Sequence, residues 1–164
     1  MENLKELFTN HVLLSPVAAW IISQIVKALI NLFVYKKFSF ERLFGDGGMP
    51  SAHSATVMCL SIMVGWTVGF GSAVFALSFI FAVVVMRDAL GVRRETGKQA
   101  ASIKQLAESV NKIFRSKDNE IKTENLKVLV GHTPLQVIFG AITGSIVAIS
   151  HILIFSVKYS SVSF

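Results

Sequence analysis

Four apolar runs divide this 164-residue chain, and each is close to the length that a membrane-spanning helix needs. A hydrocarbon core about 30 Å thick takes roughly 20 helical residues to cross. The runs cover residues 12–35, 51–68, 72–88 and 134–157. Because lipid offers no partner to backbone N–H and C=O groups, runs of this length are expected to be helical. The sequence therefore predicts an all-α, polytopic membrane helix bundle, with residues 1–164 forming a single membrane domain.

The composition supports this class of protein. Hydrophobic residues make up 52% of the chain and charged residues 16%, and the mean hydropathy is +0.60, outside the balance of an ordinary soluble domain. Cys59 is the single cysteine, so the chain alone can form neither an intrachain disulfide nor a thiolate metal cluster. We expect neither a metal nor another cofactor.

The positive charge is concentrated on one side of the predicted membrane. Lys5 and Lys158 are the two basic residues outside the spans on one side, against twelve on the side that holds residues 36–50 and 92–132. Cytoplasmic loops of membrane proteins carry such an excess. We therefore expect a multi-pass protein of the cell membrane with its large loop in the cytoplasm. In this class the net charge of +6 indicates topology and lipid headgroups rather than nucleic acid.

The large loop, residues 92–132, contains one amphipathic pattern. Apolar residues recur at helical spacing between Ala100 and Phe114, with lysines and glutamates on the other faces. A basic helix beside membrane spans is expected to lie in the membrane interface. Packing against the rest of the loop and binding a partner are alternatives that the pattern leaves open.

Three polar motifs lie where spans meet the cytoplasmic side. GGMPSAH opens the second span, RDALGVRR closes the third and GHTPLQ opens the fourth. Lys27 lies eight residues before Tyr35, about 12 Å into the first span. Segments far apart in the sequence are thus predicted to converge in one layer.

The cationic groups of this layer are suited to an anion. Helix starts present unpaired N–H groups and the positive end of the helix dipole, so the backbone near Gly48 and Ser51 is a candidate phosphate site. Arg93 and Arg94 offer planar forks that match phosphate oxygens. Lys27 would add a point charge from the bilayer side. Capping the second span is the competing role for Ser51.

Two histidines open the second and fourth spans, at His53 and His132. Near neutral pH an imidazole can attack phosphorus or give a proton to the departing oxygen. Asp88 is a candidate to neutralise the buried lysine or to orient a histidine. The competing interpretation is that each histidine is only a hydrogen-bonded residue at a helix end. His11 and His151 lie toward the opposite side, and we interpret them as structural or interfacial.

These motifs are similar to those of a known superfamily. PSAH at residues 50–53 resembles the P-S-G-H motif of the type 2 phosphatidic acid phosphatase superfamily. HTPLQV at residues 132–137, followed by Gly140 and Gly144, resembles its H-x-x-x-D-V-x-x-G-x-x-x-G element. Together with RDALGVRRETGKQA, the set resembles the divergent branch of that superfamily, which comprises small bacterial and plant membrane proteins. The likeness covers about residues 24–144.

The resemblance implies roles for individual residues. His132 would be the nucleophile that forms a phosphohistidine, and His53 would be the general acid. Ser51 and the backbone near Gly48 would help to hold phosphate. Gln136 stands where the superfamily has an acidic residue that orients the nucleophile; an amide can accept a hydrogen bond but supplies no charge.

Two further motifs of the superfamily are absent, namely a Ser-Arg pair upstream of the nucleophile and an Arg-Pro pair after the first lysine. Arg93 and Arg94 are candidates to replace the arginines, and Asp88 to replace the carboxylate.

The sequence thus predicts an integral membrane phosphatase that hydrolyses a lipid phosphate or pyrophosphate through a phosphohistidine at the cytoplasmic face. Helix starts and cationic side chains can stabilise the phosphoryl group without a metal. The alternative is a catalytically inactive protein of the same fold that binds anionic lipid or protein partners. Expected partners are membrane lipids and a phosphorylated lipid, with no nucleic acid; assembly into a homo-oligomer is left open. The small size and the Phe-rich, Lys-rich composition suit a bacterium.

Overall fold

A computed structural model describes residues 2–35, 48–114 and 132–160, and these residues contain helices and no strand. The helices are α1 (Glu2–Thr9), α2 (His11–Tyr35), α4 (Ala52–Val68), α5 (Ala73–Leu90), α6 (Val92–Phe114) and α7 (Pro134–Ser160). The all-α membrane bundle expected from the hydropathy pattern is confirmed.

The four predicted spans correspond to α2, α4, α5 and α7, within one to three residues at each end. Among the residues that the structure describes, three helical stretches are long and apolar enough to cross a membrane, namely His11–Phe33, Ala73–Ile113 and Pro134–Phe155. At 17 residues α4 is shorter, and it is the helix that the others surround.

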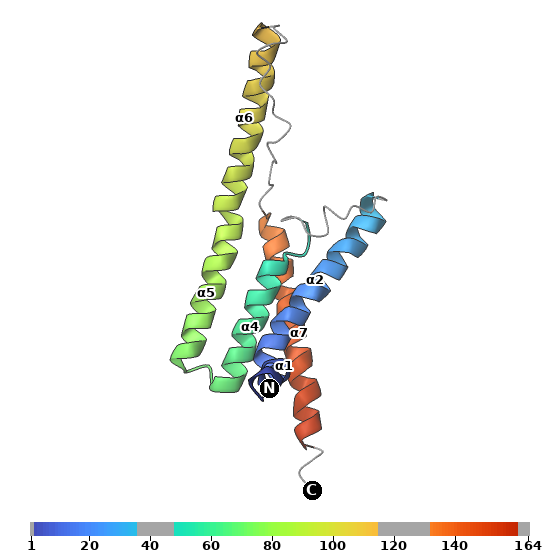
Figure 1. The fold of residues 1–164 in the computed structure, drawn as a ribbon, viewed down its shortest axis with the longest axis vertical. Helices are drawn as coiled ribbons and strands as arrows, with labels where there is room; N and C mark the ends of the chain where they lie inside the picture. The colour runs from blue at the N-terminus through green and yellow to red at the C-terminus, as the bar shows by residue number, and fades with distance from the viewer. Residues whose placement is uncertain (1, 36–47, 115–131, 161–164) are drawn as a thin grey trace.

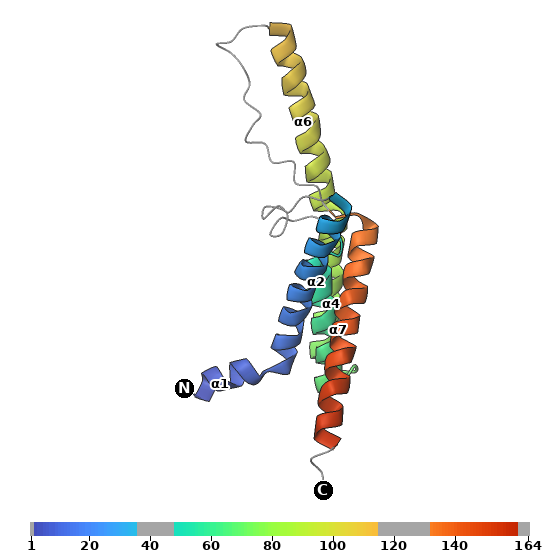
Figure 2. The same ribbon diagram turned by 90° about the vertical axis from the view of Figure 1, so that its right-hand side faces the viewer.

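The bundle is organised around α4, which packs against α2, α5 and α7 (Figure 1). Helices α2 and α7 also contact each other, whereas α5 lies at the edge and contacts the bundle mainly through α4. The short helix α1 turns away from the lower end of α2 (Figure 2). The start of α4, the start of α7 and the end of α2 lie toward the same end of the bundle, opposite α1 (Figures 1 and 2).

Small residues spaced four apart let the three central helices approach closely. Each helix presents one such stripe: Ser15, Ala19 and Ser23 on α2; the N-cap Ser51 with Ala55 and Cys59 on α4; and Gly140, Gly144 and Ala148 on α7. In lipid, helix association depends on van der Waals packing, which small residues favour by letting backbones come together. A Cβ atom at Gly144 would overlap the carbonyl oxygen of Ala55, so α4 and α7 touch backbone to backbone.

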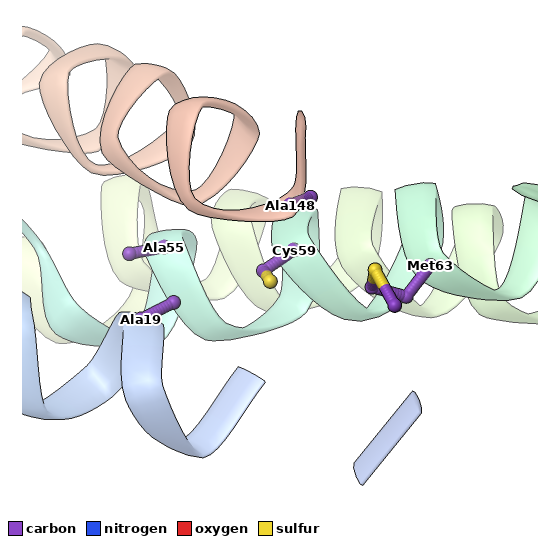
Figure 3. Packing of buried hydrophobic residues seen from close by; sticks show 5 residues of the cluster. All are labelled: Ala19, Ala55, Cys59, Met63 and Ala148. Atoms are coloured by element: carbon purple, nitrogen blue, oxygen red, sulfur yellow. The ribbon is translucent and has the colours of Figure 1, made fainter. Parts of the chain in front are cut away.

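The core lies between these stripes and is made of small side chains and two sulfur-containing ones. Ala19, Ala55, Cys59, Met63 and Ala148 form it (Figure 3).

The buried serines of α2 do not leave unsatisfied hydroxyls in this apolar interior. The Ser15 hydroxyl donates to the His11 carbonyl at 2.7 Å, and the Ser23 hydroxyl donates to the Ala19 carbonyl at 2.8 Å. Such bonds to the preceding turn satisfy the serines within their own helix.

The amphipathic helix expected in the large loop is present as α6, but its direction differs from the expectation. It continues nearly in line with α5 and projects beyond the bundle, rather than lying across the bundle end (Figures 1 and 2). Backbone hydrogen bonds cross the junction between the two helices. The Gly91 N–H donates to the carbonyl oxygen of Arg87 at 2.9 Å, and the Glu95 N–H donates to the carbonyl oxygen of Gly91 at 3.0 Å. These two hydrogen bonds tie the start of α6 to the end of α5 across Gly91, whose own backbone is not helical, and they account for the retained direction.

We predict that Gly144→Ala destabilises the bundle. The added methyl group meets the backbone of Ala55, which cannot move aside as a side chain can, and overpacking of this kind costs about 1–3 kcal/mol. The measurement is the melting temperature of the protein in detergent. Gly71→Ala is the matched control, because no atom lies within 4 Å of a Cβ at Gly71. Equal melting temperatures for the two variants would contradict the proposed contact.

Candidate functional site

Two helix starts are joined at the end of the bundle where the predicted site residues lie. The backbone N–H of Ser51, which precedes α4, donates to the carbonyl oxygen of Gln136 in the first turn of α7 at 3.0 Å. A Cβ atom at Gly140 would overlap the Ser51 carbonyl oxygen. The GGMPSAH and GHTPLQ motifs, more than 80 residues apart, are therefore in direct contact.

Lys27 passes over Gly48 in the loop that leads into α4. Lys27 is 3% exposed, and a Cβ atom on Gly48 would lie 3.2 Å from its Cγ and 3.3 Å from its Cδ. Gly48 also has a φ of +93°, a conformation that favours glycine. The absence of a side chain at Gly48 thus serves both the turn and the lysine stem. Two of the predicted phosphate-binding residues are brought together in this way.

Ser51 caps α4, which is one of the two roles expected for it. It has an extended backbone, and its hydroxyl oxygen accepts from Ser54 N–H at 3.4 Å and from the Ser54 hydroxyl at 3.0 Å. Both serines are fully buried. The cap fixes the first turn of α4, where unpaired N–H groups and the positive end of the helix dipole are found.

His132 is 2% exposed and stands just before α7. The next residue begins a reciprocal cap: Thr133 N–H donates to the Gln136 side-chain oxygen at 3.0 Å, and Gln136 N–H donates to the Thr133 hydroxyl at 3.4 Å. This is the capping box that the pattern T-x-x-Q encodes. The sequence contains that signal at residues 133–136, but our interpretation of Gln136 as an orienting residue did not use it.

The capping box gives Gln136 a different way of acting on His132 from the direct side-chain contact that was expected. Its side-chain oxygen holds the backbone of Thr133, the residue that follows His132. Gln136 therefore contributes to the position of His132 through the main chain, which a residue without charge can do.

His53 and Asp88 lie at the same depth on neighbouring helices. Helices α4 and α5 are antiparallel and are joined by a short turn at residues 69–72. His53 is fifteen residues before the end of α4, and Asp88 is fifteen residues after the start of α5. His53 is exposed and Asp88 is half-buried, in contrast to the buried His132. The candidate acid, His53, is thus exposed on the protein surface, whereas the candidate nucleophile, His132, is enclosed by the protein.

The remaining predicted residues are placed only in part. Arg93 and Arg94 lie in the first turn of α6, directly after α5, and their side chains fall outside the part of the chain that the structure describes.

Within the described ranges, no three His, Cys, Asp or Glu side chains are grouped as metal ligands would be. At the opposite end of the bundle, His11 and His151 bridge α2 and α7, with ring nitrogens 3.2 Å apart and both rings against Phe155. This contact agrees with their interpretation as structural residues.

Comparisons with known proteins match most of the chain. The pattern of the Divergent PAP2 family matches residues 8–147, a range that includes every predicted site residue. A protein of Bacillus subtilis (strain 168), described as the uncharacterized membrane protein YuiD, is 43% identical over 145 residues, which are 85% of this chain and 92% of that protein. No solved structure matches the chain.

We predict that Gly48→Ala displaces Lys27, whereas Gly69→Ala does not. Both glycines have a φ near +90°, so both variants are strained by about 1–3 kcal/mol, but no atom lies near a Cβ at Gly69. The measurement is modification of each lysine by an amine reagent, followed by mass spectrometry, with the exposed Lys104 as the internal reference. Modification of Lys27 should increase only in Gly48→Ala. An equal increase in both variants would show that strain alone exposes the lysine.

Proposed function

Because the chain belongs to the Divergent PAP2 family, and is therefore a PAP2-like membrane protein, we propose that it hydrolyses a lipid phosphate or pyrophosphate at the cytoplasmic face of the cell membrane. The observation that supports this most is the Lys27 stem packed over Gly48, at a helix start hydrogen-bonded to the start that carries His132. A cation, an anion-binding helix start and a nucleophile candidate share one end of the bundle.

Phosphate would bind at the start of α4. The first turn of a helix presents N–H groups toward an anion, and the dipole favours negative charge there. Lys27 would add a full positive charge from the bilayer side, and Arg93 and Arg94 would approach from α6. Ser51 would act mainly by fixing the cap, with its hydroxyl oxygen beside the phosphate. These groups stabilise charge on the transferring phosphoryl group in a site where water is partly excluded.

The chemistry would proceed in two displacements at phosphorus. In the first, an imidazole nitrogen of His132 forms a P–N bond while the bond from phosphorus to the leaving oxygen breaks, and His53 gives that oxygen a proton. In the second, water attacks phosphorus, His53 takes the proton from the water, and the P–N bond breaks to release inorganic phosphate. The proton that His53 takes from the water replaces the one it gave to the leaving oxygen, and Asp88, at the same depth, would orient His53.

A lipid is the favoured substrate because the proposed site would lie at the membrane surface and its lysine would lie inside a span. Lys27 is eight residues from the end of α2, about 12 Å along the helix. A phosphate that reaches this lysine can remain attached to a hydrocarbon chain in the bilayer. A soluble phosphate ester would have to bring its polar remainder to the same depth.

A second candidate function is binding without hydrolysis, to an anionic lipid or to a protein partner. The use of Gln136 as a capping residue favours it, because the carboxylate that would stabilise a charged His132 is absent from that position. Binding would need only Lys27 and the helix start.

We predict that the purified protein releases phosphate from at least one of phosphatidic acid, phosphatidylglycerol phosphate and polyprenyl pyrophosphate, and that His132→Ala reduces release by 100-fold or more, as expected for a lost nucleophile (about 10²-fold or more). His151→Gln is the control, since His151 lies at the other end of the bundle. Phosphate release is measured in detergent with each lipid.

Two results would contradict this mechanism. One is no release from any lipid, and the other is equal release by His132→Ala. If there is no release but a lipid phosphate still raises the melting temperature, and if Arg93→Ala combined with Arg94→Ala abolishes that rise, the binding function is supported instead.

The orientation can be tested with a cysteine placed on α6. Ser102 is exposed, and the native Cys59 is fully buried and should not react. In intact cells a membrane-impermeant maleimide should label Gly71→Cys in the turn between α4 and α5, and Ser102→Cys only after permeabilisation. Labelling of Ser102→Cys from outside would reverse the proposed topology.

A further inference from the structure

Gln24 is an exception among the polar side chains of α2. Its side-chain oxygen is buried and has no hydrogen-bond partner, whereas Ser15 and Ser23 are satisfied by carbonyls of their own helix. The hydrocarbon chains of the bilayer cannot supply the missing hydrogen-bond donor. A buried acceptor without a partner costs about 1–3 kcal/mol, so a purely structural position would favour an apolar residue of the same size.

Gln24 lies one helical turn from Lys27, the cation of the proposed phosphate site. It is three residues before Lys27, which places the two side chains on one face of α2. Helix α2 runs toward the site end of the bundle, so Gln24 is about 4.5 Å deeper in the membrane than Lys27. If a lipid phosphate is held at Lys27, the carboxamide of Gln24 lies beside the part of the lipid between the phosphate and the hydrocarbon chain.

The chemistry of the unpartnered atom restricts what can lie there. An amide oxygen only accepts hydrogen bonds, so its partner must be a donor. Phosphate dianions and ester carbonyls are acceptors. Diacyl phosphatidic acid and polyprenyl phosphates carry no donor between phosphate and chain, whereas a monoacylglycerol phosphate carries a hydroxyl and a sphingoid base phosphate carries a hydroxyl and an amine.

We propose that Gln24 is a specificity-determining residue that accepts a hydrogen bond from a hydroxyl or amine on the hydrocarbon side of the lipid's phosphate group. The proposal rests on the proposed lipid phosphate site. It adds a preference, among lipid phosphates, for those that carry a polar donor next to the phosphate.

Replacement of Gln24 by leucine separates this role from a structural one. Leucine has a similar size and removes the unsatisfied oxygen, so the melting temperature of the ligand-free Gln24→Leu protein should be equal to or above that of the intact protein. Ligand recognition should change in the opposite direction. A structural residue would not produce these two effects together.

The test compares two ligands that differ by one hydroxyl. They are the non-hydrolysable phosphonate analogue of 1-oleoylglycerol 3-phosphate and the same compound without its C2 hydroxyl. Dissociation constants are measured in detergent for the intact protein, for Gln24→Leu and for Gln105→Leu, a matched control on the exposed face of α6. We expect the intact protein and Gln105→Leu to bind the hydroxyl compound about tenfold more tightly, and Gln24→Leu to bind the two compounds equally.

The other outcomes are equally decisive. Equal binding of both compounds by the intact protein overturns the proposal while leaving the phosphate site in place. A hydroxyl preference that persists in Gln24→Leu also overturns it, since the donor would then have another partner. If neither compound binds, this proposal fails, whereas the proposed function is decided by the phosphate-release experiment. A preference that Gln24→Leu abolishes supports the proposal even if no lipid is hydrolysed.

Discussion

The close contact between α4 and α7 is the interaction on which the site depends. Glycines at positions 140 and 144 let the backbone of α7 lie against that of α4, and the Ser51 N–H then reaches the Gln136 carbonyl. Larger residues at these glycines would separate the helices and break that hydrogen bond. Because each helix start carries one of the two histidine motifs, their relative position is set by van der Waals packing rather than by a polar network. That suits a lipid environment, where packing is the main force between helices.

A second constraint is the burial of a lysine. A charged side chain inside a span is expensive unless it reaches a polar layer or an opposite charge. The stem of Lys27 packs against Gly48 in the loop that leads into α4, so a residue outside α2 makes room for this lysine. The same arrangement places a cation beside the first turn of α4. Stability of the bundle and the proposed affinity for an anion would thereby be linked through one contact.

The two capping arrangements show how local signals and tertiary contacts combine. Ser51 and the Thr133–Gln136 capping box are each encoded within four residues and could be recognised from the sequence alone. The role of Ser51 was recognised, whereas Gln136 was interpreted through a motif in which its place is taken by an acidic residue. The direction of α6 was not foreseen, because the amphipathic pattern defines a face of the helix but not the angle at Gly91.

The sequence alone was enough to predict the helical class, the positions of four apolar helices, and the set of polar motifs at their ends. Hydropathy and capping are local properties, so a window of about 20 residues contains the whole signal. Only the tertiary structure decided which of these residues touch. Two contacts join separate segments of the chain, namely that of Lys27 with Gly48 and the hydrogen bond from Ser51 to Gln136. The same packing leaves the side-chain oxygen of Gln24 without a partner. These features follow from how side-chain volumes fit between helices, and no periodicity within one helix contains that information.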